Sequence, residues 1–206
     1  MEKFLALEAE KRERILNAGM KEFAANGFDR ASTNAIVKEA GISKGLLFHY
    51  FTSKKQFYLY LFQYGAELTM KEFYAAEEWR KPDLLDRLEL MMGMKLEIWQ
   101  RHPELFRFLE TAYLESSAAV QPELGEQLRI LQNEEMPEVL SGIDLSRFRE
   151  GIEPGRAIQL ILWSLEKVGD HLLKQFKPEE SGAVPYKEMT EETKRYLELL
   201  RRAFYS

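Results

Sequence analysis

Apolar residues recur at three- and four-residue spacing along most of this chain, which is typical of amphipathic helices. No segment alternates apolar and polar residues over the length of a strand, and the sequence has neither internal repeats nor low-complexity tracts. The first predicted helix runs from about Leu7 to Asn26 and ends at Gly27, because glycine readily adopts the left-handed conformation that closes many helices. The pattern as a whole predicts an all-α protein.

The longest predicted helix runs from Ser53 to about Trp79, ahead of a break at Pro82. Gly65 lies inside it, where glycine lowers helix stability by about 1 kcal/mol relative to alanine. Such a glycine either permits a close packing contact or softens the helix as a hinge, and we favour the packing contact. Five further apolar faces predict helices over Leu85–Trp99, Leu105–Tyr113, Leu124–Val139, Ile158–Phe176 and Met189–Phe204. Longer connections are expected at Gly142–Gly155 and Pro178–Pro185.

Residues Ser32–Phe57 predict two short helices joined by a glycine turn. Ser32 or Thr33 can cap the first helix, Gly41 ends it, and Ser43 can cap the second. Within the second helix, Leu47 and Phe51 share a face that can lock it to the first. This arrangement is a helix-turn-helix, and it indicates a DNA-binding protein.

The outward face of the second helix carries the chemistry that supports this interpretation. Lys44, Gly45 and Phe48 lie near its start, where a small or donor-bearing residue lets the backbone approach bases and phosphates. His49 and Tyr50 add flat rings with one donor each. Lys54 and Lys55 then place positive charge at the start of a helix, where it opposes the helix dipole. Phosphate groups of DNA would neutralise this charge. The alternative is that these two lysines are simply solvated.

The segments NGFDRAST, AGISKGLLFHYF and SKKQF closely resemble the DNA-binding domain of the tetracycline-repressor (TetR) family, over residues 10–57. The resemblance implies a helix-turn-helix domain over residues 1–52 and a helical ligand-binding and dimerisation domain over residues 53–206. Carried over residue by residue, it implies base contacts from Asn34, Lys44, Gly45 and Phe48, and phosphate contacts from Thr33, His49, Tyr50, Lys54 and Lys55. Leu46 and Phe48 depart from the family pattern, because many members have a hydroxyl-bearing residue at each position.

The charge distribution agrees with a DNA-binding head. The 206 residues carry a net charge of −5, yet the first 60 contain ten Lys or Arg against seven Asp or Glu, a net of +3. The remaining residues contain 19 basic and 27 acidic side chains, a net of −8. A basic head on an acidic body predicts local, salt-dependent binding to nucleic acid rather than indiscriminate coating.

Several other classes of protein are disfavoured by the composition. The absence of cysteine excludes disulfides and thiolate chemistry and is compatible with a reducing cytosol. His49, His102 and His171 lack metal-ligand spacing, and no phosphate-cradling glycine loop or serine elbow is present, so we expect neither an enzyme nor a cofactor. The longest uncharged stretch is eleven residues, Gln56–Ala66, against the ~20 needed to span a bilayer. With no visible signal peptide, the expected location is the cytoplasm.

A homodimer is expected on two grounds. One recognition helix contacts few base pairs, so specificity usually comes from two half-sites about 34 Å apart. The family that the chain resembles also pairs its last two helices with those of a second protomer. The expected interface residues lie on the apolar stripes of these helices: Ile161, Leu165, Gly169, Leu172, Tyr196, Leu197, Leu200 and Phe204. The alternative is that the stripes cover the protomer's own core.

An effector pocket is expected in the second domain, where soft methionines and large rings suit an apolar ligand. The candidate lining residues are Met91, Met92, Trp99, Phe106, Leu109, Glu110, Tyr113 and Trp163. Ordinary core packing is the alternative for each of them. The sequence thus predicts a transcriptional repressor that binds a palindromic double-stranded DNA operator as a dimer and is released by a small apolar or amphipathic effector. A helical protein-interaction bundle, or an activator-type regulator without a ligand, remains as the alternative.

Overall fold

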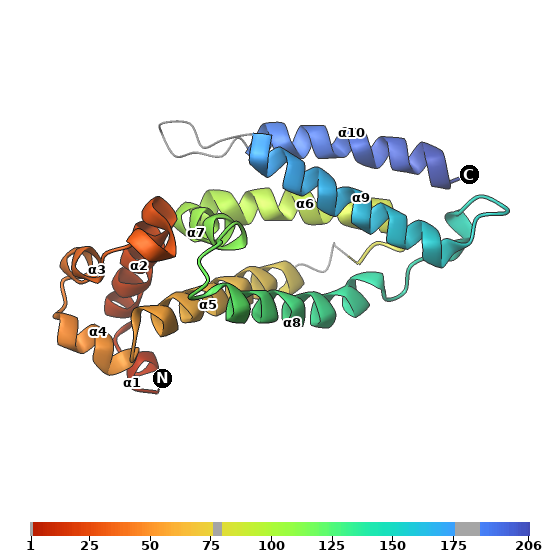
Figure 1. Cartoon of the computed structure of the whole chain (residues 1–206). Helices are drawn as coiled ribbons and strands as arrows, with labels where there is room; N and C mark the ends of the chain where they lie inside the picture. Colours follow the sequence, from red (N-terminus) through yellow and green to blue (C-terminus); the bar gives the residue numbers. More distant parts are fainter. Residues whose placement is uncertain (1, 76–79, 176–185) are drawn as a thin grey trace. The chain divides into compact units, whose positions relative to one another are not determined.

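The computed structural model describes residues 2–75, 80–175 and 186–206, without the side chains of residues 2, 99, 132–136, 173 and 186. The described residues form helices and no strand, which confirms the all-α prediction (Figure 1). Their order is α1 (Glu2–Leu5), α2 (Ala9–Arg30), α3 (Thr33–Ala40), α4 (Lys44–Tyr50), α5 (Lys54–Ala75), α6 (Leu84–Arg101), α7 (Pro103–Tyr113), α8 (Gln121–Leu140), the 3-10 helix η2 (Leu145–Arg147), α9 (Pro154–Gln175) and α10 (Tyr186–Phe204). The ends of the helices predicted over Ser53–Trp79 and Ile158–Phe176, and the whole connection predicted over Pro178–Pro185, lie outside the described residues.

The chain divides into two compact units that interleave along the sequence. The first contains Met1–Lys71 and Trp99–Met136, and the second contains Glu72–Ile98 and Pro137–Ser206. The boundary expected after residue 52 is a division by function and stays a prediction. The compact units differ from it because α7, from the middle of the chain, packs on α2 and so joins the first unit.

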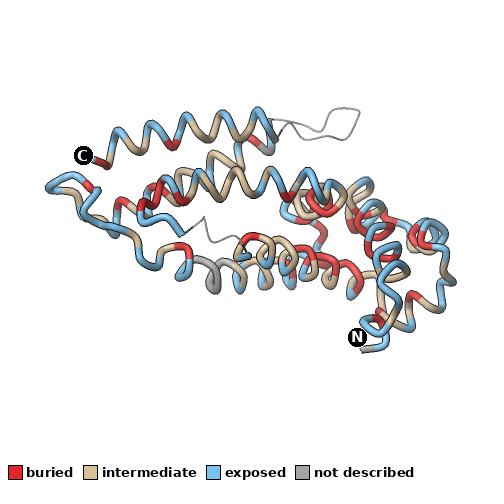
Figure 2. Tube along the Cα trace, turned by 180° about the vertical axis from the view of Figure 1, so that it is seen from behind, coloured by how far each residue is buried: buried red, intermediate tan, exposed pale blue. Residues whose placement is uncertain are grey.

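An aromatic core holds the first unit together. Phe23 of α2 meets the ring of Tyr58 of α5 edge-on at 4.9 Å between centroids, and Tyr58 meets Phe108 of α7 at 5.2 Å. All three side chains are buried. Figure 2 colours the chain by burial and shows buried positions alternating with exposed ones along the helices. Edge-to-face pairs at this spacing add about 0.5–1.5 kcal/mol each beyond their buried area. The helix-turn-helix region therefore shares one core with α5 and α7.

Gly65 of α5 lies in a close contact with α7, which supports the packing interpretation of this glycine. A Cβ atom at this position would stand 2.6 Å from Cδ1 of Leu105 and 3.1 Å from Cδ2 of Leu109. Both distances are shorter than an ordinary van der Waals contact. The absence of a side chain therefore lets α5 and α7 approach each other.

The second unit has a smaller core between α6, α9 and α10. Its buried members include Leu85, Ile161 and Leu197, and Phe148 and Tyr205 close it with an edge-on ring contact at 5.0 Å. Asp83 begins α6 by accepting from the backbone N–H of Asp86 at 2.9 Å. α9 and α10 pack against each other along this core. These two helices are the ones for which a role in dimer formation is expected.

Candidate DNA-binding site

The turn between α3 and α4 has the geometry that the sequence predicts. The Ser32 hydroxyl accepts from the backbone N–H of Ala35 at 3.4 Å and caps α3, and the Ser43 hydroxyl accepts from Leu46 N–H at 3.1 Å and caps α4. Gly41 has φ 65° and ψ 36°, the left-handed conformation that favours glycine. The Ile42 N–H then donates back to the Val37 carbonyl at 3.0 Å, which satisfies the end of α3.

The inward and outward faces of α4 also follow the sequence. Leu47 and Phe51 are each 1% exposed and pack into the core of the first unit. Lys44 and Gly45 are exposed on the opposite side, and Phe48 is half-buried. A Cβ atom at Gly45 would meet nothing within 4 Å, so the protein's own packing does not require glycine there. Among the described residues, no ion pair includes Lys44.

Asn34 and Thr33 begin α3, where Asn34 is exposed and Thr33 is half-buried. At the other end of the site, His49 is exposed and Tyr50 is half-buried against Phe4, with 5.6 Å between ring centroids. All four residues are thus exposed or half-buried in the first unit. Their roles stay predictions.

Lys54 has a different task from the phosphate contact that the sequence suggested. Its ammonium group donates to three backbone carbonyls, those of Phe28 at 2.7 Å, Asp29 at 3.2 Å and Ala31 at 3.1 Å. A lysine has three N–H donors, so all of them are used. The ammonium also lies 4.6 Å from the centroid of the Phe28 ring. We therefore correct the expectation for Lys54, because it closes the end of α2 and joins it to α5.

Lys55 is engaged as well, by a salt bridge of 2.6 Å to Glu123 of α8. Both side chains are well exposed, so the pair contributes little stability. A phosphate would have to compete with this carboxylate. The two lysines at the start of α5 thus have partners within the protein that their sequence positions did not reveal.

The short helix α1 is part of the site and was not predicted from the sequence. Phe4 is fully buried, and its ring contacts those of Tyr50, Phe51 and Tyr60 at 5.6, 4.9 and 5.6 Å between centroids. Four residues give no helical periodicity to detect, so the few apolar residues before α2 were the only sequence signal. Through these ring contacts, α1 supports the C-terminal end of α4.

The loop after α7 holds the start of the helix-turn-helix. The Glu115 carboxylate accepts from the Phe28 N–H at 2.7 Å and from the N–H groups of Ser116 and Ser117 at 2.9 Å each. The Ser117 hydroxyl donates to the Asp29 carboxylate at 2.7 Å. We call these contacts the Glu115 latch. They attach the last turn of α2 to residues that lie almost ninety positions later in the chain.

The expected dimer residues divide between the core and the surface of the second unit. Ile161, Leu172 and Leu197 are between 0% and 3% exposed, so they are covered within their own protomer and are corrected as interface residues. Leu165, Leu200 and Phe204 pack partly against the same core, and Gly169 is half-buried. Tyr196, at 38% exposed, is the one expected residue with a large outward side. The outward apolar residues Leu160, Trp163 and Leu199 are 48%, 56% and 61% exposed. None of them was among the expected interface residues, and Trp163 was expected in the effector pocket.

The expected effector residues belong to both units, and several have core roles. Met91, Met92 and Trp163 belong to the second unit, where Met92 packs on the core and Trp163 points to solvent. The α7 residues belong to the first unit: Phe106 is buried, Leu109 packs against Gly65, Glu110 is half-buried and Tyr113 is exposed. The side chain of Trp99 lies outside the described residues. A pocket formed by these residues stays a prediction.

A groove of about 580 Å³ lies in the first unit and uses none of the expected effector residues. Helix α2 forms one wall, and Tyr64, Leu68, His102 and Leu105 line another part of it. Over the ranges described, no cluster of His, Asp and Glu could hold a metal ion. Nor is any described helix both long and apolar enough to cross a membrane.

The N-terminal part of the chain is similar to known bacterial regulators. The family model described as "Bacterial regulatory proteins, tetR family" matches residues 15–61. The HTH-type transcriptional regulator UidR of Escherichia coli K12 is 52% identical over 44 residues, which are 21% of this chain and 22% of UidR. The match to UidR thus spans about a fifth of the relative's length, and the family model covers the helix-turn-helix described above.

Solved structures extend the similarity of fold to the whole chain. A TetR family regulator from Chloroflexus aurantiacus covers 100% of this chain and 98% of its own, with a TM-score of 0.63 and 23% identity. The transcriptional regulator FadR of Bacillus subtilis, solved in complex with stearoyl-CoA, covers 91% of this chain and 96% of its own, with a TM-score of 0.60 and 18% identity. The helix-turn-helix geometry, the family match and the similarity to UidR show that the chain belongs to the TetR family of transcriptional regulators, and the solved structures show the same fold along its length.

Proposed function

We propose that this protein represses transcription by binding a palindromic operator as a dimer and that a small apolar or amphipathic effector releases it. The observation that supports the proposal most directly is the start of α4, where Lys44 and Gly45 are exposed and no carboxylate of the described residues pairs with Lys44. Backbone N–H groups at a helix start, together with an unpaired lysine, suit the close approach of a phosphate backbone and of base edges.

In this proposal Asn34, Lys44, Gly45 and Phe48 contact bases, and Thr33, His49 and Tyr50 hold phosphates. Lys55 joins them only where a phosphate displaces Glu123. Lys54 is left out, because its three donors are used within the protein. The base contacts determine which sequence is bound, whereas the phosphate contacts set the position of the protein on the duplex.

The proposal is tested by selecting bound duplexes from a random pool and comparing the affinity for the selected sequence with that for random DNA. Lys44→Ala and Phe48→Ala should reduce the ratio of the two affinities. Lys71→Ala, at an exposed position 17 residues beyond Lys54 on α5, is the matched control and should leave the ratio unchanged. Failure to enrich an inverted repeat would contradict the palindromic operator, and equal losses on both DNAs would contradict the assigned base contacts.

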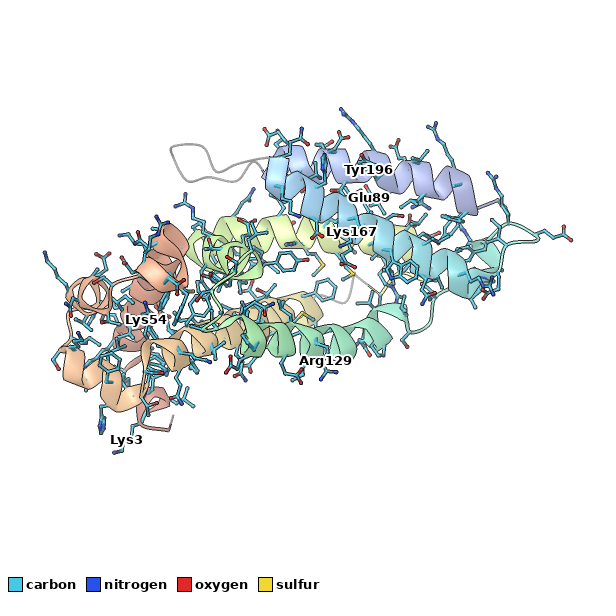
Figure 3. The ribbon with its side chains drawn as sticks, in the orientation of Figure 1. Lys3, Lys54, Glu89, Arg129, Lys167 and Tyr196 are labelled. Atoms are coloured by element: carbon cyan, nitrogen blue, oxygen red, sulfur yellow. The ribbon has the colours of Figure 1, made fainter. Side chains whose placement is uncertain are left out.

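The proposed dimer surface is the outward apolar face of α9 and α10, formed by Leu160, Trp163, Tyr196 and Leu199. Four large apolar side chains exposed on two adjacent helices are unusual for a surface that stays in water. Figure 3 labels Tyr196 on α10. A second copy would bury them in an isologous four-helix contact.

Sedimentation of Trp163→Glu and Leu199→Glu tests this surface, because a buried charge without a partner disfavours association. Both variants should shift the protein towards the monomer. Leu145→Glu is the control, since Leu145 is 50% exposed on η2 and lies outside this face. Dimers of unchanged stability in both variants would contradict the proposal.

The effector is proposed to be apolar or amphipathic on two grounds. The second domain is rich in methionine and aromatic residues, and the FadR protein that shares this fold was solved with stearoyl-CoA. An effector releases DNA only if it binds the released arrangement more tightly than the DNA-bound one. Titration of acyl-CoA into the protein–operator complex tests the proposal, and binding of the ligand without any loss of operator affinity would contradict it.

A further inference from the structure

Lys3 of α1 is an exposed lysine beside α4 whose ammonium group has no acidic partner. Its Nζ lies 3.5 Å from Nε2 of His49, on the exposed side of α4. No ion pair of the residues that the structure describes includes Lys3. A neutral imidazole nitrogen can accept one N–H, which leaves two of the three ammonium donors for another acceptor.

The helix that carries Lys3 is firmly attached to the DNA-binding region. The neighbouring Phe4 is fully buried among Tyr50, Phe51 and Tyr60. The guanidinium of Arg12 donates to the Leu5 carbonyl at 3.0 Å and so holds the end of α1 to α2. Lys3 is therefore placed by the core of the first unit, which lowers the entropy lost when it binds a ligand.

Lys3 and Lys54 differ in how many of their ammonium N–H donors are left to bind an anion. The ammonium of Lys54 is saturated by three carbonyls within the protein, whereas that of Lys3 meets one weak acceptor. Figure 3 labels both residues and shows Lys3 projecting where α1 and α4 lie. An exposed cation with free donors thus stands on α1, a segment outside the helix-turn-helix motif.

We propose that Lys3 and His49 together hold one backbone phosphate of the operator, with Phe4 as the residue that positions Lys3. This inference rests on the proposed DNA-binding function and adds to it a contact from α1. A phosphate oxygen beside both groups replaces the Lys3–His49 contact: it accepts from the Lys3 ammonium and from Nε2 of His49, which carries the proton in the DNA complex. The contact carries no sequence information and contributes equally on every duplex.

The test is the salt dependence of DNA affinity in Lys3→Met, with Lys71→Met as the matched control. Each phosphate contact contributes about 0.9 to the slope of log affinity against log salt, so the slope should fall by about 0.9 per bound protomer. At about 0.1 M salt, the same relation gives about an eightfold loss of affinity per protomer, equal on operator and random DNA. Lys3→Arg should restore most of the loss, because it returns the charge.

Phe4→Ala tests the positioning role, with Phe4→Leu as the conservative variant. Phe4→Ala should reproduce the lower salt slope of Lys3→Met, and Phe4→Leu should lower the slope by less. Thermal unfolding first establishes that both variants are folded at the assay temperature. If the wild-type protein binds DNA and Lys3→Met keeps its slope and affinity, the inference about Lys3 is wrong and the proposed function stands. If the wild-type protein binds no duplex, the proposed function itself fails.

Discussion

Replacing Lys54 by methionine separates the two roles that this residue has been given. Methionine keeps an unbranched apolar chain of similar length but removes the ammonium that binds the carbonyls of Phe28, Asp29 and Ala31. If these bonds are its task, Lys54→Met should lower stability and leave the salt dependence of DNA binding unchanged. If Lys54 binds phosphate instead, the reverse should hold.

The expected magnitude follows from the contacts. A hydrogen bond to a charged group contributes about 1.5–3 kcal/mol net, but the three bonds share one ammonium and their energies do not add. The contact with the Asp29 carbonyl is exposed, so water can replace the ammonium there, whereas those with Phe28 and Ala31 are partly buried. We expect the free energy of unfolding to fall by about 2 kcal/mol, which for a chain of this length lowers the melting temperature by about 4–8 °C.

The assay is denaturant-induced unfolding of Lys54→Met beside Lys55→Met, its neighbour on the same helix. Lys55 has a single exposed salt bridge to Glu123, so its loss should cost less than about 1 kcal/mol. Salt titrations of DNA affinity are then compared for both variants. Unchanged stability in Lys54→Met, with a salt slope lower by about 0.9 per protomer, would refute the assignment of Lys54 to the end of α2.

Three further predictions concern the first unit. Gly19→Ala should destabilise the protein by about 1–2 kcal/mol in denaturant unfolding, because the new Cβ would stand 2.6 Å from the buried ring of Phe57. Gly125→Ala should instead stabilise it by up to about 1 kcal/mol, because its Cβ would meet only a side-chain atom at 3.9 Å. Glu115→Ala should speed hydrogen exchange at the Phe28 N–H, which loses its acceptor; unchanged exchange would show that the latch does not hold this segment. Burial raises the pKa of Tyr58 and Tyr60, so the native state keeps protons that the unfolded chain loses above about pH 10. Stability should therefore fall with rising pH in that range, and pH-independent unfolding there would contradict the burial of these hydroxyls.

The features predicted well from the sequence are those that local chemistry decides. Ser32, Gly41 and Ser43 each act through hydrogen bonds or backbone conformation within a few residues, so their roles could be predicted without knowledge of the rest of the chain. The same holds for the inward positions of Leu47 and Phe51, because they repeat at helical spacing.

The features predicted poorly depend on partners that are distant in the sequence. Lys54 looked like a phosphate ligand because its carbonyl partners lie more than twenty residues earlier and belong to a helix end that no pattern marks as its neighbour. The apolar stripes of α9 and α10 show the same limit. Periodicity identifies residues that avoid water, but it does not distinguish Leu197, covered by its own protomer, from Leu199, which is exposed.

The contacts of α7 constrain how the signal of the proposed effector can reach the DNA-binding helices. α5 cannot swing α2–α4 independently of α7, because Phe108 shares their aromatic core, Gly65 packs closely on Leu105, and the Glu115 latch holds the Phe28 N–H. Breaking all of these contacts would expose a buried core, at a cost well beyond the few kcal/mol that a ligand's differential affinity supplies. A release mechanism consistent with the structure therefore moves α7 together with the DNA-binding helices. The alternative, in which the head turns on α5 alone, requires the latch and the Gly65 contact to be dispensable, and substitutions at Glu115 and Gly65 distinguish the two.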